Sequence, residues 1–169
     1  MPLRPASIPA VLIALCLGPA GNLSAQSAAG DEAAARAVAD SALAAITRSD
    51  FIALTDLMLD SAVTFSAGLR NGEYRIQFRN RAQQRATSSG GRYVERGFNP
   101  EVRVSGPLAM LWLPYDFYRD GEWSHCGVDL FTLIKSDGGW RIATVAWSVE
   151  QPPDCARHPA GPPPEATAE

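Results

Sequence analysis

Apolar and polar residues alternate along three consecutive segments in the last third of the chain, at 108–118, 122–136 and 140–149. A period of two is typical of half-buried β-strands. Asp120-Gly121 joins the first two segments, and Asp137-Gly138-Gly139 joins the second and third. Asp-Gly between alternating segments is a strong signal for a tight hairpin turn. The three segments are therefore expected to form an antiparallel meander.

The preceding half of the chain has mostly helical patterns. Apolar residues at helical spacing predict a helix over 31–49, and a second short helix follows over 50–59 with Asp50 as its N-cap. A short strand is expected at 62–66, a third helix with a thin apolar stripe at 75–86, and strand pieces at 92–98 and 101–104. Helices followed by a run of strands predict an α+β domain, with about three helices packed on one face of a curved antiparallel sheet.

Both ends of the chain differ in composition from the middle. Arg4 precedes an apolar stretch at 8–17 that is too short to span a bilayer, and small residues follow it. Residues 1–25 are therefore predicted to be a signal peptide, cleaved after Ala25 or Ala29; a disordered or buried N-terminal helix is the alternative. The folded domain would cover 26–155. The Pro- and Ala-rich tail at 156–169 has few large apolar residues and is expected to be disordered.

Cleavage of this segment would leave a periplasmic or secreted protein without a membrane anchor. Cys126 and Cys155 would then be its two cysteines, and an oxidising compartment favours a disulfide between them. Two cysteines without a spaced His or Cys set do not predict a metal site. Arginines are scattered and the net charge is −3, so no nucleic-acid partner is expected. No phosphate-binding or dinucleotide motif is present, and no cofactor is predicted.

The two turns also predict which side chains share a face of the sheet. A two-residue turn at Asp120-Gly121 places Asp116 opposite His125 and Trp112 opposite Asp129, and the next turn places Asp129 opposite Trp147. One face would then carry Trp112, Asp116, Tyr118, His125, Asp129, Phe131 and Trp147. The other would carry Leu111, Leu113, Tyr115, Phe117, Val128, Leu130, Ile134 and Ile142. A slip of one residue in either turn would change this assignment.

The first of these faces combines aromatic walls with a few ionisable groups, as ligand pockets do. Trp112, Asp116, Tyr118, Phe131 and Trp147 are its predicted lining, and Asp129 and His125 are candidates for an acid–base pair. Structural roles are the alternatives. Asp129 could hydrogen-bond to a backbone N–H or to the indole of Trp112 or Trp147, and His125 could pair with Asp116.

The second face is apolar as well, and the helices can cover only one side of the sheet. A homodimer through Leu111, Leu113, Val128, Leu130 and Ile142 would bury it. The pattern leaves open which face is concave. If these residues instead face the helices, both the pocket assignment and this interface must be revised.

The block 115–118, the turn 120–121, the segments 124–131 and 137–142, and Trp147 together resemble the nuclear transport factor 2-like superfamily, especially its SnoaL-like and lumazine-binding branches. The resemblance implies a cone-shaped α+β fold with helices on the concave face, an enclosed cavity and often a homodimer. The superfamily includes ketosteroid isomerases, dehydratases, polyketide cyclases and many non-enzymatic members, so it does not fix an activity. We therefore expect an exported domain that binds a small apolar molecule or only dimerises. The alternative is a cofactor-independent isomerase, dehydratase or cyclase that uses general acid–base catalysis.

Overall fold

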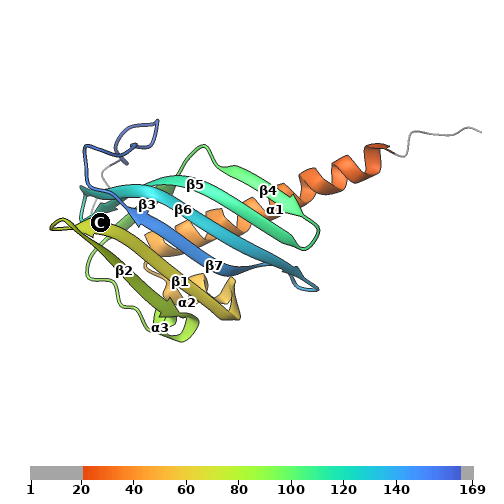
Figure 1. Ribbon diagram of the computed structural model, residues 1–169, viewed down its shortest axis with the longest axis horizontal. Helices are drawn as coiled ribbons and strands as arrows, with labels where there is room; N and C mark the ends of the chain where they lie inside the picture. Colours follow the sequence, from red (N-terminus) through yellow and green to blue (C-terminus); the bar gives the residue numbers. More distant parts are fainter. Residues whose placement is uncertain (1–20, 165–169) are drawn as a thin grey trace, which may run out of the picture.

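The computed structural model describes residues 21–164, with side chains from residue 28 onward. Most of the predicted signal peptide lies outside the described residues. Three helices and seven strands follow one another along the chain (Figure 1): α1 (Gly21–Thr47), α2 (Phe51–Asp56), β1 (Met58–Arg70), β2 (Glu73–Asn80), α3 (Arg81–Arg85), β3 (Tyr93–Gly97), β4 (Glu101–Ser105), β5 (Leu108–Arg119), β6 (Glu122–Ser136) and β7 (Gly139–Val149).

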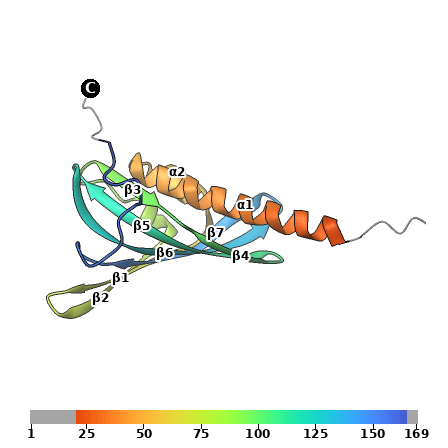
Figure 2. The same ribbon diagram turned by 90° about the horizontal axis from the view of Figure 1, so that it is seen from above.

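The strands form one curved sheet in the order β2-β1-β7-β6-β5-β3, and β4 also pairs with β5. All neighbouring strands run antiparallel except β1 and β7, which are parallel. The helices lie on the concave face of the sheet, while the convex face has no helix over it (Figure 2). The predicted α+β class, with helices on one face of a curved sheet, is therefore confirmed.

The core lies between the helices and the concave face. Ala35, Ala39 and Ala42 are completely buried along one side of α1, and these small side chains let the helix approach the sheet closely. The sheet contributes large apolar side chains to the same core: Leu111, Leu113, Phe131, Leu133, Trp140 and Ile142. At the end of α1 the chain turns into α2, where the Asp50 carboxylate accepts a hydrogen bond from the Ala53 N–H at 2.8 Å. The predicted N-cap is confirmed.

The predicted helix at 75–86 is wrong over most of its length. Residues 73–80 form strand β2, and only 81–85 are helical. Tyr74, Ile76 and Phe78 alternate with polar residues, which is the period of a strand. The preceding Asn71-Gly72 has positive φ at both positions, as a tight hairpin turn requires, so this dipeptide was the sequence signal for a β1–β2 hairpin.

The predicted register between β5 and β6 is correct only next to the turn, where Tyr118 pairs with Trp123. A bulge follows, with Ser124 as the extra residue, and Phe117 then pairs with His125. Beyond the bulge, β5 is shifted by one residue relative to β6. The β5 side chains that were expected to share a face with His125 and Asp129 therefore lie on the opposite face. A second bulge, at Ala143 in β7, pairs Leu133 with Ile142 rather than with Ala143.

The predicted dimer face is divided by this shift. Leu111, Leu113 and Ile142 face the helices and are at most 2% exposed. Val128 and Leu130, which are half-buried, lie on the convex face opposite Pro114 and Trp112. The interface as predicted is therefore wrong in its residues.

Cys126 and Cys155 form a disulfide, with their Cα atoms 5.9 Å apart. Cys126 also exchanges two backbone hydrogen bonds with Glu150, as the predicted hairpin register requires. The bond indicates an oxidising environment outside the cytoplasm. In the part of the chain that the structure describes, no helix is both long and apolar enough to cross a membrane.

The residues after Cys155 pass along the sheet end formed by β3, β5 and β6. Within the tail that was predicted to be disordered, the guanidinium of Arg157 stacks on the Trp123 ring at 4.0 Å, and the His158 N–H donates to Asp116 at 3.1 Å. These contacts hold the first part of the tail against the domain. The last five residues lie outside the described part, and their disorder stays a prediction.

Candidate functional site

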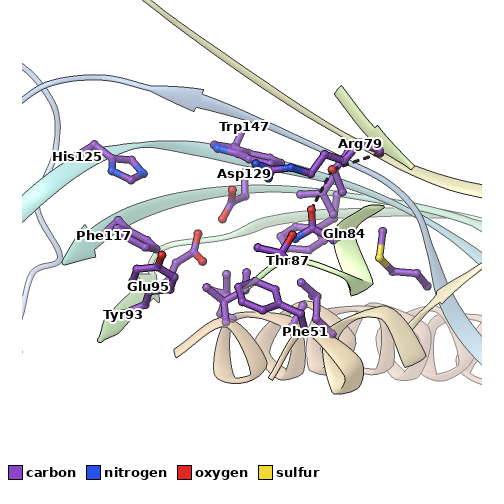
Figure 3. A pocket seen from close by; sticks show the side chains of 18 of the residues that line it. Phe51, Arg79, Gln84, Thr87, Tyr93, Glu95, Phe117, His125, Asp129 and Trp147 are labelled. Carbon is purple, nitrogen blue, oxygen red and sulfur yellow. Dashed lines mark hydrogen bonds between the residues drawn. The ribbon is translucent and has the colours of Figure 1, made fainter. Parts of the chain in front are cut away.

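A cavity of about 390 Å³ lies between the concave face of the sheet and the helices (Figure 3). Its volume is within the range of small-molecule sites. Most of its lining is apolar and comes from α1, α2 and the central strands: Ala42, Leu43, Ile46, Phe51, Leu54, Met58, Phe117, Phe131, Val145 and Trp147. Polar side chains form two groups on this wall, and the other polar lining residues are Ser88, Tyr93, Arg119, Ser124 and His125.

The first polar group is a pair of carboxyls, Glu95 from β3 and Asp129 from β6, which point toward one another across the cavity in Figure 3. The backbone N–H of Glu95 donates to the Thr47 hydroxyl at 3.1 Å, which fastens β3 to the end of α1. Asp129 lies opposite Trp147 in the sheet and is 3% exposed. Its Oδ2 atom is buried without a hydrogen-bond partner among the described residues.

Burial changes the protonation of this pair. It raises the pKa of Glu95 to about 8. Burial, and after it the charge of Glu95, raises the pKa of Asp129 well above its ordinary value. Two carboxyls that share a dry site do not both ionise readily, because each charge opposes the other. At neutral pH the pair therefore holds at least one proton, and the protonated carboxyl can donate a hydrogen bond.

His125 lines the same cavity, nearer to its aromatic end. Its ring stacks on Phe117 with a centroid distance of 4.6 Å and meets Tyr115 edge-on at 5.8 Å. Burial lowers the pKa of His125 to about 4, so the imidazole is neutral at physiological pH. The Ser124 hydroxyl lies 3.1 Å from Nδ1. The expected alternative, a His125–Asp116 pair, is wrong because the bulge places Phe117 opposite His125.

The second polar group lies where β2 and α3 close the cavity, and it consists of Arg79, Gln84, Thr64 and Thr87. The Thr64 hydroxyl lies 3.5 Å from both the Arg79 carbonyl and Gln84 Oε1, and it can donate its one proton to either. Gln84 is 7% exposed. Among the described residues, neither the Gln84 amide nitrogen nor the Arg79 guanidinium has a hydrogen bond or an ion pair.

Four of the seven predicted site residues line the cavity: His125, Asp129, Phe131 and Trp147. Trp112 instead lies on the convex face with 46% of its surface exposed. Asp116 is completely buried on that same side, where Arg96 donates to its two oxygens at 3.0 and 2.5 Å. Tyr118 packs beneath the same guanidinium. These three residues are therefore misplaced in the predicted pocket.

Glu95, Arg79 and Gln84 were missed. Glu95 lies in a predicted strand, but nothing local indicates that this strand pairs with β5 and carries Glu95 opposite Phe117. The signal for Arg79 was available. The alternation of Tyr74, Ile76 and Phe78 places Arg79 on the other face of a strand, whereas the predicted helix over 75–86 does not.

No protein-family model matches this sequence, and no curated protein matches it. Solved structures do. An NTF2-like protein with a cystatin-like fold from Novosphingobium aromaticivorans has a TM-score of 0.60 and 16% identity, over 79% of this chain and 91% of that one. The chain has the nuclear transport factor 2-like fold. A protein of unknown function from Mycobacterium tuberculosis shares this fold with a TM-score of 0.59 and 15% identity, over 87% of this chain and 81% of the other.

A nuclear transport factor 2-like protein from Streptomyces avermitilis, provisionally named a dehydratase, is similar with a TM-score of 0.55 and 16% identity, over 72% of this chain and 96% of its own. Identities at this level show the fold alone. Because this fold carries many activities, function has to be argued from the cavity of this chain. Among the described residues, no group of three or more His, Cys, Asp or Glu side chains could hold a metal ion.

Proposed function

We propose that the cavity binds a small, largely apolar molecule with a carbonyl or hydroxyl group, and that Asp129 is its polar anchor. The observation that carries this proposal is the buried, unpartnered Oδ2 of Asp129 in a cavity whose lining is mostly apolar. An unsatisfied buried oxygen costs about 1–3 kcal/mol, and a ligand group that pairs with it would remove this cost. The neighbouring aromatic rings would cover the apolar part of the ligand.

Native mass spectrometry and a thermal-shift screen with steroids, flavin precursors and aromatic acids test the proposal. Asp129→Leu fills the same space without polar atoms and is expected to abolish binding of any hit. Asp129→Asn keeps an N–H donor and is expected to retain binding. Thr132→Leu, on the same strand but the opposite face, is the matched control. Unchanged affinity in Asp129→Leu would contradict the assignment of the anchor.

Acid–base catalysis on such a ligand is the second candidate function, and the raised pKa values of Glu95 and Asp129 in the same cavity favour it. One protonated and one ionised carboxyl facing the same space can act as an acid and a base on one substrate. In this version the neutral His125 would orient the substrate or accept a proton from it. Asp129→Asn separates the two functions, because it is expected to keep binding and to lose turnover. Full turnover in Asp129→Asn would contradict the catalytic version.

We also propose that the domain forms a homodimer through the convex face. Five apolar residues from adjacent strands are aligned across it: Phe78, Phe65, Ala146, Leu130 and Trp112. Phe78, Phe65 and Trp112 are 54%, 38% and 46% exposed, although they are large and apolar. Sheet faces stack against one another with interdigitating side chains, so a second copy of this face is a suitable cover.

A further inference from the structure

The second polar group of the cavity differs in charge from the first. Arg79 carries a permanent positive charge, whereas the Glu95–Asp129 pair is at least partly protonated at neutral pH. A guanidinium beside apolar walls is normally paired with a carboxylate or phosphate. The neighbouring Arg81 and Arg85 form ion pairs with Asp56 and Asp60. Arg79 forms no ion pair within the described part of the chain.

Gln84 gives an independent indication at the same wall. The Thr64 hydroxyl lies within reach of Oε1, and the amide nitrogen of Gln84 has no hydrogen bond among the described residues, so its two N–H groups are available as donors. The residue is more than nine-tenths buried, and its side chain lines the cavity beside that of Arg79 in Figure 3. The Gln84 amide nitrogen is not among the polar atoms that are sealed off without a partner, so it can reach the space of the cavity and donate there. Arg79 and Gln84 thus present only donors to the cavity.

We infer that the ligand of this cavity is an organic acid whose carboxylate is bound by Arg79 and Gln84, with its apolar body toward Phe131 and Trp147. The inference rests on the proposed function, which supplies the opposite anchor at Asp129. A planar carboxylate can accept from a guanidinium and an amide together. A cationic ligand would meet the charge of Arg79 without compensation, and a purely apolar one would displace water from both donors without replacing its hydrogen bonds.

Three probes separate the two anchors: 4-oxo-4-phenylbutanoate, its primary amide, and 4-phenylbutanoate. Calorimetry on the mature protein at pH 7 is expected to give about tenfold or tighter binding for the acid than for the amide, because a charge-assisted pair replaces a neutral one. Arg79→Gln is expected to bring the two compounds to equal affinity. Arg75→Gln is the matched control, since it removes the same charge from an exposed position of the same strand.

Gln84→Glu is the second variant, in case Arg79→Gln impairs folding. It preserves the shape of the side chain but places a negative charge beside the ligand, so it is expected to weaken binding of the acid and to spare the amide. A preference for the acid that persists in Arg79→Gln would overturn the inference.

Equal affinity of the wild-type protein for acid and amide would also overturn it. If Asp129→Leu then abolished binding of both compounds, the proposed function would stand without the carboxylate site. Binding of 4-phenylbutanoate as tight as that of the oxo-acid would instead contradict the anchor at Asp129 and leave the carboxylate site intact. If none of the three probes binds, the inference is contradicted. The neutral compounds of the earlier screen would then decide the proposed function separately.

Discussion

Replacing Glu95 by Gln should make the protein more stable at alkaline pH. Below pH 4 the carboxyl is protonated in both the folded and the unfolded chain, so it does not affect the stability. Between its ordinary pKa of 4.5 and its folded pKa of about 8, the unfolded chain releases the proton while the folded protein keeps it. The free energy of unfolding therefore falls as the pH rises through this window. Gln, which cannot ionise, removes that loss.

The size of the effect follows from the two pKa values. At about 1.4 kcal/mol for each pH unit, the difference corresponds to an upper limit of about 5 kcal/mol at pH 9. Water that enters the cavity would stabilise the ionised carboxylate and reduce this value, and Asp129 competes for the same proton. We therefore expect Glu95→Gln to be more stable than the wild type by about 2 kcal/mol at pH 9, relative to their difference at pH 4.

Urea unfolding followed by circular dichroism, at several pH values from 4 to 9 and with the disulfide intact, measures this difference. Glu101→Gln, on the exposed side of β4, is the matched control and should show no dependence on pH relative to the wild type. A difference between Glu95→Gln and wild type that stays constant over the whole range would refute the reasoning, because it would show that Glu95 ionises alike in both states.

Three further predictions concern stability and assembly. Free-thiol titration of the unreduced mature protein should detect neither Cys126 nor Cys155, and two reactive thiols would contradict the pairing; loss of the bond should cost about 3–4 kcal/mol. Arg96→Met should lower the stability in urea by about 3–5 kcal/mol, because it leaves the buried Asp116 carboxylate unpaired; adding Asp116→Leu should recover much of this loss. Leu130→Arg should give a folded monomer by light scattering. Unfolded protein at every concentration would place Leu130 in the core instead.

The sequence was most informative where local chemistry determines the structure. The bounds of β5, β6 and β7 are predicted to within one residue, although their register is not, because Asp120-Gly121 and Asp137-Gly138-Gly139 are turns that short segments specify by themselves. The Asp50 cap depended on a short-range signal as well, whereas the Cys126–Cys155 pair followed from the number of cysteines and the expected oxidising compartment. Asn71-Gly72 is a turn signal of the same kind, and the β1–β2 hairpin that it specifies carries Arg79.

The parts of the site that could not be predicted depend on contacts between distant segments. Glu95 reaches the cavity because β3 pairs with β5 and because Thr47 holds its backbone against α1. The raised pKa values of Glu95 and Asp129 depend on burial beneath the helices and on their mutual proximity. The periodicity of residues along one strand indicates neither which strands pair nor which carboxyls are buried together.

The two bulges connect these failures of prediction to the origin of the cavity. One lies at Ser124, beside the aromatic end of the cavity, and the other at Ala143, beyond Val145 at its opposite end. A bulge bends its strand and increases the local twist, and bulges are frequent beside functional sites. Between them β6 carries His125, Asp129 and Phe131 on the concave face. Both irregularities that shift the predicted register therefore lie near cavity-lining residues, where a bulge can bend its strand around the helices.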